Sequence, residues 1–160
     1  MSAISVHRNW QIDSMEKSII IAEQLLASIS DSAIFDKRDG GDGWTISEVL
    51  GHLVETEAGF YDRAKLTVET DNPQLPFSDP NQTVVEKGYA SQNALDVFKK
   101  WQANRLPYLA YLRSLPEDDA TWERPAQHPR RGTFTLTDQL MLAAWHDTNH
   151  IHQIVKIIQS

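Results

Sequence analysis

Three of the chain's six histidines lie close together near its C-terminal end, in the segment WHDTNHIHQI at residues 145–154. If this segment is helical, His146 and His150 point in directions that differ by only about 40°, so both imidazoles can reach one ion. His152 lies about 200° around the helix from His150 and should face away. The spacing favours a metal site at His146 and His150, which needs at least one further ligand.

His52 is the candidate for this third ligand. It follows a predicted helix start at Thr45 and shares a helix face with Val49 and Leu53. If its helix packs antiparallel to the last one, His52 reaches the height of His150, because each lies about 10–12 Å from the matching helix end. Three imidazoles with an open position are typical of catalytic zinc, and imidazole also binds nickel, iron and copper.

The same histidines also allow an interpretation without a metal. Two histidines one helical turn apart often form a partly exposed polar pair, and a buried histidine such as His52 is often hydrogen-bonded to a carbonyl. The glycine of GHL at residues 51–53 would then serve only close packing. Spacing alone leaves both interpretations open.

Few other polar residues suggest chemistry. Glu55 and Asp147 are the carboxylates nearest to the histidines in sequence, and each is either a base or metal-site partner or a structural charge. Gln153 follows the histidine pair by one helical turn and either orients a ligand or caps a backbone group. His7 and His128 flank irregular segments and indicate no site.

The composition limits the class of protein. A chain of 160 residues with 41% hydrophobic residues predicts a single domain over residues 1–160 that buries its own core. The formal charge of −7 disfavours nucleic-acid binding, and HPRRG at residues 128–132 is too short to reverse it. No apolar run of about 18 residues is present, so we expect a cytoplasmic protein without a membrane segment. With no cysteine, any metal must be held by histidine or carboxylate.

Apolar residues recur with helical spacing in four segments, and no segment shows the alternation of a strand. The sequence therefore predicts an all-α four-helix bundle with helices at about 13–30, 45–68, 91–115 and 135–158. Capping pairs mark three of the helix starts: Asp13 with Glu16, Thr45 with Glu48, and Thr135 with Asp138. Pro107 removes a backbone donor, so we expect a kink or short break near residues 104–106.

The link between the second and third helices is long. It contains about 22 residues, whereas antiparallel neighbours need only about 2 to 8. Such a link can run the full length of a bundle and let the helices it joins lie parallel, which predicts one crossover. Alternatively, this link or the one before the last helix forms a mobile lid over a site.

The segments WTISEVLGHLVETE and HPRRGTFTLTDQLMLAAWHDTNHIHQI, with the four-helix layout, resemble the DinB-like superfamily, the DinB/YfiT-type metalloenzymes. The resemblance covers about residues 13–159 and is most specific at the histidine of GHL and at HDxxHxxQI, which places His52, His146 and His150 at the ligand positions. It implies an up-down-down-up bundle, a three-histidine divalent metal site and a homodimer. Pro107 departs from the family pattern.

Members of this superfamily include thiol-dependent S-transferases and isomerases that use bacillithiol or mycothiol. The resemblance therefore implies a metal-dependent enzyme of S-transferase or hydrolase type that acts on a small molecule. Zinc or nickel is the first candidate for the ion, followed by iron or copper. Because the chain has no cysteine, a low-molecular-weight thiol would enter as a cosubstrate.

Two other classes of function stay open. A noncatalytic bundle would use the ion only for stability or for sensing a small ligand. A metal-free interaction module would contain no bound ion at all. An open coordination position facing a pocket favours the enzyme, whereas a fourth protein ligand favours the structural role.

Overall fold

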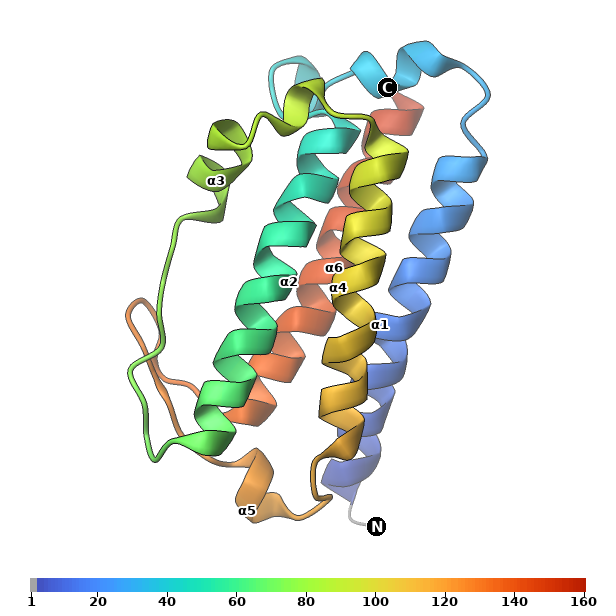
Figure 1. Ribbon diagram of the computed structural model, residues 1–160. Helices are drawn as coiled ribbons and strands as arrows, with labels where there is room; N and C mark the ends of the chain where they lie inside the picture. Colours follow the sequence, from blue (N-terminus) through green and yellow to red (C-terminus); the bar gives the residue numbers. More distant parts are fainter. Residues whose placement is uncertain (1–2) are drawn as a thin grey trace.

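Four long helices form the body of the protein (Figure 1). The computed structural model describes residues 3–160, and its long helices are α1 (Ala3–Ala27), α2 (Ile46–Glu69), α4 (Ala94–Ser114) and α6 (Leu136–Gln159). Helices α1 and α6 run in one direction, and α2 and α4 run in the other. This confirms the predicted all-α, up-down-down-up bundle and the crossover between its second and third long helices.

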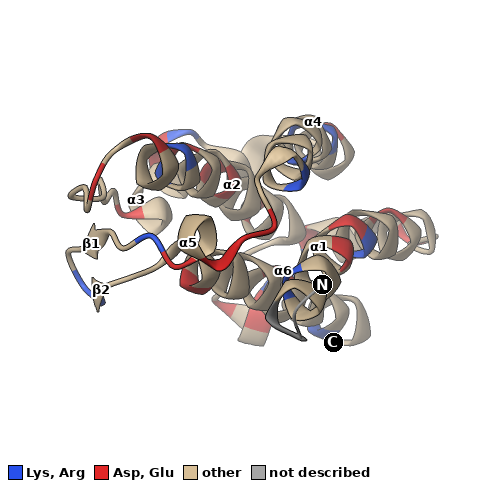
Figure 2. Cartoon of the chain, turned by 90° about the horizontal axis from the view of Figure 1, so that it is seen from below, with Lys and Arg blue, Asp and Glu red and all other residues tan. Residues whose placement is uncertain are grey.

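Shorter elements occupy the three links. The 3₁₀ helices η1 (Ser32–Asp36) and η2 (Asp39–Gly41) join α1 to α2, and the crossover contains α3 (Pro80–Glu86) and η3 (Tyr89–Ser91). The last link contains α5 (Asp119–Trp122) and an unpredicted hairpin of β1 (Gln127–His128) and β2 (Gly132–Thr133). Figure 2 shows α3 and the hairpin on the same side of the bundle. A bridge between Gln74 and Gln127 joins the two links there.

The predicted caps of α2 and α6 are confirmed. Glu48 accepts a hydrogen bond from the backbone nitrogen of Thr45 at 2.9 Å, and Asp138 accepts one from that of Thr135 at 2.9 Å. In both pairs the threonine side chain accepts from the third helical residue in return, which completes a capping box. These caps fix where the two histidine-bearing helices begin, at opposite ends of the bundle.

The predicted start of the first helix at Asp13 is wrong, because α1 already begins at Ala3 and ends at Ala27. Asp13 lies inside the helix, and its carboxylate and that of Glu16 contact Arg113 of α4 at 3.4 and 2.8 Å. Acidic residues three positions apart resemble a capping box in sequence, but here both form surface ion pairs with an arginine of the neighbouring helix.

Of the kink or short break expected near Pro107, the break does not occur, because α4 continues from Ala94 to Ser114. A proline leaves the carbonyl four residues earlier without its helical partner, and here that carbonyl belongs to Ala103. Pro107 and Ala103 are both exposed, so water can take the place of the missing donor.

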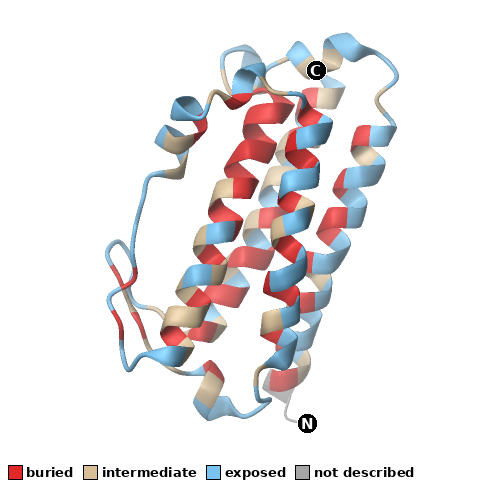
Figure 3. Cartoon of the chain, in the orientation of Figure 1, coloured by how far each residue is buried: buried red, intermediate tan, exposed pale blue. Residues whose placement is uncertain are grey.

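Buried residues recur along all four long helices (Figure 3). Their apolar members form two clusters, one in each half of the bundle. One cluster includes Leu50 and Trp101, and the other includes Phe60 and Leu140. Arg105 of α4 lies between them and is 1% exposed. The core therefore contains a buried charged layer at its middle.

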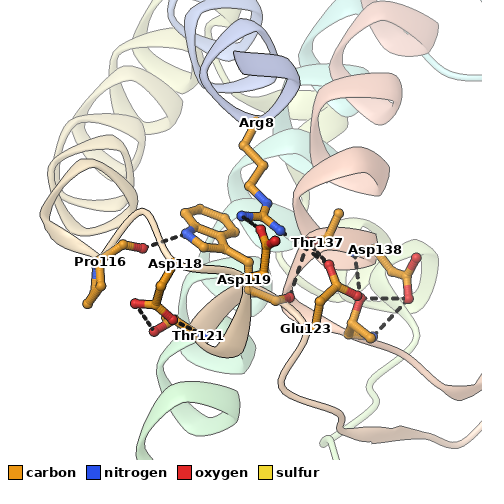
Figure 4. A network of polar contacts seen from close by, with 10 residues as sticks. Arg8, Pro116, Asp118, Asp119, Thr121, Glu123, Thr137 and Asp138 are labelled. Carbon is orange, nitrogen blue, oxygen red and sulfur yellow. Dashed lines mark hydrogen bonds and ion pairs between the residues drawn. The ribbon is translucent and has the colours of Figure 1, made fainter. Parts of the chain in front are cut away.

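Ion pairs fix the last link to the end of the bundle where α1 begins (Figure 4). Arg8 of α1 forms ion pairs with Asp119 at 3.0 Å and Glu123 at 3.3 Å, and its guanidinium lies over the ring of Trp122. The indole nitrogen of Trp122 donates a hydrogen bond to the carbonyl of Pro116 at 2.8 Å.

Within residues 3–160, no helix is both long and apolar enough to cross a membrane.

Candidate metal centre

The imidazoles of His52, His146 and His150 lie together between α2 and α6. Their candidate ligand atoms all fall within 4.8 Å of one another. The Nε2 atoms of His52 and His146 are 2.9 Å apart, and the ring of His150 lies 4.6 Å from that of His52 and 4.4 Å from that of His146 between centroids. The structure thus brings together all three residues that the sequence singled out.

Helix geometry explains this convergence. His52 lies two turns into α2, and His146 and His150 are one turn apart on α6, which packs beside α2 in the opposite direction. His52 is only 6% exposed. His152 is exposed and lies outside the cluster, as its angle on the helix predicted.

A chain of polar contacts fixes the tautomer of His150. The Nδ1 atom of His150 lies 2.8 Å from Oε1 of Gln153, whose amide nitrogen donates to Asp39 at 3.0 Å. A carboxylate only accepts hydrogen bonds, so Gln153 must present its oxygen to His150. Nδ1 therefore carries the proton, and the lone pair of Nε2 is free to bind a ligand.

The other two imidazoles have no partner at Nδ1 like that of His150, and they pack against aromatic rings. Trp44 lies 5.1 Å from the ring of His52, and Phe60 meets the ring of His146 edge-on at 5.5 Å. Nδ1 of His52 and Nδ1 of His146 are buried without a hydrogen-bond partner within residues 3–160. In every tautomer the neutral pair leaves a nitrogen unpaired, so contact between the two rings does not satisfy them.

The environment keeps all three imidazoles neutral. Burial, followed by the charge of His150, lowers the pKa of His52 to about 4. Burial also lowers the pKa of His146, to about 2, and the pKa of His150 falls for the same reason. Neutral imidazole is the form that binds metal, so the fold presents these side chains in the binding state at neutral pH.

The two nearby carboxylates are engaged elsewhere. Glu55 accepts hydrogen bonds from Lys87 at 2.9 Å and from the hydroxyl of Tyr89 at 2.6 Å. Asp147 faces the bundle interior and pairs with Arg105 at 2.6 Å. Neither belongs to the histidine cluster, so within residues 3–160 no histidine or carboxylate joins these three as a fourth ligand.

Two hollows meet at the imidazoles. A pocket of about 450 Å³ reaches His52 and His146 from one side, between α2, the crossover, the hairpin turn and α6. A more open hollow of about 640 Å³ reaches the same two residues and His150 from the side of Asp39 and Lys156. The cluster is therefore open to small molecules.

Several residues around the histidine cluster were not identified from the sequence. His128, which indicated no site, is 6% exposed and lines the smaller pocket together with Arg63, Arg130 and Arg131. Asp39, which orients Gln153, comes from the link before α2, 114 residues away in the chain. The basic segment HPRRG is recognisable in the sequence. Its position beside the pocket is not, because it lies in an irregular link whose path has no periodicity.

Comparison with known proteins identifies the family. The model of the DinB superfamily matches residues 16–154. Relatives from Oceanobacillus iheyensis and Bacillus subtilis, each named "Putative metal-dependent hydrolase", are 25% identical over 115 residues and 28% identical over 121. The alignments cover 72% and 75% of this chain, but 65% and 66% of the relatives, so the chain spans just under two-thirds of their length.

Solved structures share the fold. YfiT from Bacillus subtilis, described as an unusual four-helix bundle, superposes with a TM-score of 0.87 at 22% identity, over 99% of this chain and 89% of that one. A mycothiol-dependent maleylpyruvate isomerase superposes with a TM-score of 0.73 at 12% identity, over 96% of this chain and 63% of that one. The resemblance found in the sequence is confirmed, and the chain belongs to the DinB superfamily.

Proposed function

We propose that His52, His146 and His150 hold one divalent metal ion and that the protein is a metal-dependent enzyme acting on a small molecule. The observation that carries this proposal is the convergence of three neutral imidazoles at the meeting point of two hollows, without a fourth protein ligand among residues 3–160. This donor set suits zinc or nickel first, and iron or copper next.

The fit of an ion rests on imidazole Nε2 atoms that have no hydrogen-bond partner outside the histidine cluster within residues 3–160. Gln153 and Asp39 keep the Nε2 lone pair of His150 free, and the Nε2 atoms of His52 and His146 face each other at 2.9 Å. An ion would accept these lone pairs, whereas the three rings alone cannot satisfy one another. Trp44 and Phe60 pack against the rings and limit their rotation.

Hydrolysis is the first reaction class that we propose. When bound, a divalent ion supplies a Lewis acid that lowers the pKa of water or of a thiol toward neutrality. The protein contributes three neutral ligands and a pocket whose apolar lining includes Phe60, Leu142 and Trp145. The names of the relatives, metal-dependent hydrolases, agree with this class.

Thiol transfer is the second candidate. The mycothiol-dependent isomerase shares the fold, and the open hollow beside His150 offers a second approach to the cluster for a cosubstrate. Since this chain has no cysteine, the thiol would come from solution. A noncatalytic role is less well supported, because a purely structural ion normally has a closed set of protein ligands.

A cobalt experiment separates these possibilities. Untagged protein loaded with cobalt(II) should show visible absorption bands of low-coordinate cobalt, and His146→Ala should not. A sulfur-to-cobalt charge-transfer band after addition of a small thiol would favour transfer. Its absence, with metal-dependent cleavage of an ester or amide panel, would favour hydrolysis. Absence of cobalt bands in the wild-type protein would contradict the proposal.

Homodimer formation stays a prediction that light scattering would check.

A further inference from the structure

The smaller pocket has a basic wall opposite the imidazoles. Arg63 comes from α2, and Arg130 and Arg131 come from the turn that joins β1 to β2, which is blue in Figure 2. Arg63 lines the same pocket as His128 of the hairpin and His146 of the histidine cluster. The basic wall and the candidate metal centre therefore share one cavity.

The three arginines of this wall have no carboxylate partner within residues 3–160. By contrast, Arg8, Arg38, Arg105 and Arg113 each form an ion pair. Each wall arginine instead lies over an aromatic ring: Arg63 over Phe60 at 5.4 Å, Arg130 over Phe77 at 4.1 Å, and Arg131 over Phe134 at 5.7 Å. A ring face holds a guanidinium in place while leaving its N–H groups free to donate.

The glycine one turn before Arg63 leaves room for its guanidinium. Nε of Arg63 donates to the carbonyl of Gly59 at 2.9 Å, and a Cβ atom at Gly59 would lie 2.9 Å from Nη2 of Arg63. A larger residue at position 59 would push the guanidinium aside. The side chain is therefore positioned by the helix beside it, and only its remaining donors are available to a ligand.

His128 adds a neutral donor to the same wall. Its Nδ1 accepts a hydrogen bond from the backbone nitrogen of Arg130 at 3.1 Å, so the proton resides on Nε2. Burial and the neighbouring arginines lower the pKa of His128, which keeps the ring neutral. Glu55, the acidic residue that lines this pocket, is already paired with Lys87 and Tyr89. The cavity thus has a net positive wall in a chain whose formal charge is −7.

We propose that this pocket binds a small organic anion, whose carboxylate or phosphate group contacts Arg63, Arg130 and Arg131 while the rest of the molecule extends toward the imidazoles. Arginine recognises both groups through the same planar fork of donors. The identification of this anion as the substrate rests on the function proposed above. Its binding to the arginines does not, because these residues lie outside the histidine cluster.

Calorimetric titration of metal-free, untagged protein tests this inference. The probes are succinate, its neutral analogue succinamide, and inorganic phosphate, at low ionic strength. Succinate or phosphate should bind at least about ten-fold more tightly than succinamide, since a hydrogen bond to a charged group is commonly worth ten-fold or more. Tighter binding of succinate would support a carboxylate ligand, and tighter binding of phosphate would support a phosphate ester.

Arginine variants locate the binding site. Arg63→Gln and Arg130→Gln should each weaken anion binding by about ten- to a hundred-fold. Arg113→Gln, in an arginine outside the pocket, should leave it unchanged. Circular dichroism checks folding, and Arg130 lies on an exposed turn outside the core. Equal affinity for succinamide, equal weakening by Arg113→Gln, or no anion binding to folded wild-type protein would overturn the inference.

Measuring zinc uptake by the same wild-type protein beside these titrations separates this inference from the proposed function. Failure to take up zinc, with anion binding intact, would contradict only the metal centre. Stoichiometric metal uptake without anion binding would contradict only the anion pocket.

Discussion

Helix α6 carries two buried polar clusters at adjacent residues. Asp147 joins Arg105 and Glu57 at the centre of the bundle, and His146 joins His52 and His150 beside the pockets. All five N–H groups of Arg105 are used: they donate to Glu57, to Asp147 and to the carbonyl of Met15 at 2.5 to 2.9 Å. In the histidine cluster, by contrast, Nδ1 of His52 and of His146 has no partner within residues 3–160.

This difference separates two uses of buried polarity. The arginine network is closed, since each donor of its cation has an acceptor and the layer is shielded from solvent. The histidine cluster is open, since its candidate ligand nitrogens converge beside two pockets and no fourth protein ligand joins them within residues 3–160. The first joins α2, α4 and α6 into one scaffold, and the second is arranged for a ligand.

The largest effect should follow from breaking the closed network. Arg105→Met leaves Glu57 and Asp147 buried without their cation, so the free energy of unfolding should fall by about 3–5 kcal/mol. Urea denaturation of metal-free protein measures this loss. Arg113→Met, in a half-exposed surface arginine, is the control and should cost less than about 1 kcal/mol. A similarly small loss for Arg105→Met would show that the network is not structural.

Acid should weaken the metal-free protein through the open cluster. Because burial lowers the pKa of His52 from 6.5 to about 4, the unfolded chain binds a proton that the folded chain does not bind in this interval. The stability that His52 contributes is thus present above pH 6.5 and is lost as the pH falls toward 4, by about 1.4 kcal/mol per pH unit. Denaturation of His52→Gln should show a shallower dependence, and an unchanged slope would refute the assignment.

A smaller effect is expected at the contact that orients His150. Gln153→Ala removes the acceptor of the Nδ1 proton and leaves the three imidazoles in place. Residues that orient a metal ligand commonly contribute about ten- to a hundred-fold in affinity. Competition with a chromogenic chelator measures the zinc dissociation constant. Wild-type affinity in this variant would show that Gln153 does not position the ligand.

The smallest effect should come from His152→Ala. This histidine is exposed and stands outside the cluster, so the zinc dissociation constant should stay within about two-fold of the wild-type value. The same competition assay applies, and a large loss would mean that the site uses the other face of α6.

Local sequence patterns predicted what depends on one helix. The four-residue spacing of His146 and His150 and the capping boxes at Thr45 and Thr135 follow from helical geometry, and the structure contains them as expected. The predicted start of α1 was wrong because acidic residues that form a surface ion pair have the same spacing as a capping pair. The pattern that predicted a break at Pro107 did not reveal that this residue faces water.

The remaining parts of the site depend on contacts between distant segments. His52 was placed only by assuming antiparallel packing of two helices, which the family resemblance supported. Asp39 and the arginines of the hairpin turn come from irregular links, where no periodicity predicts direction. The buried partner of Asp147 is Arg105, 42 residues away, and nothing in the local sequence identifies it.

The most direct test of the metal centre is the metal content of untagged protein after equilibrium dialysis against zinc, measured by elemental analysis. We predict about one zinc ion per chain for the wild-type protein and for His152→Ala, and less than about a tenth of an ion for folded His52→Ala, His146→Ala and His150→Ala. Wild-type protein without stoichiometric zinc, or undiminished zinc in His52→Ala, would contradict the three-histidine site.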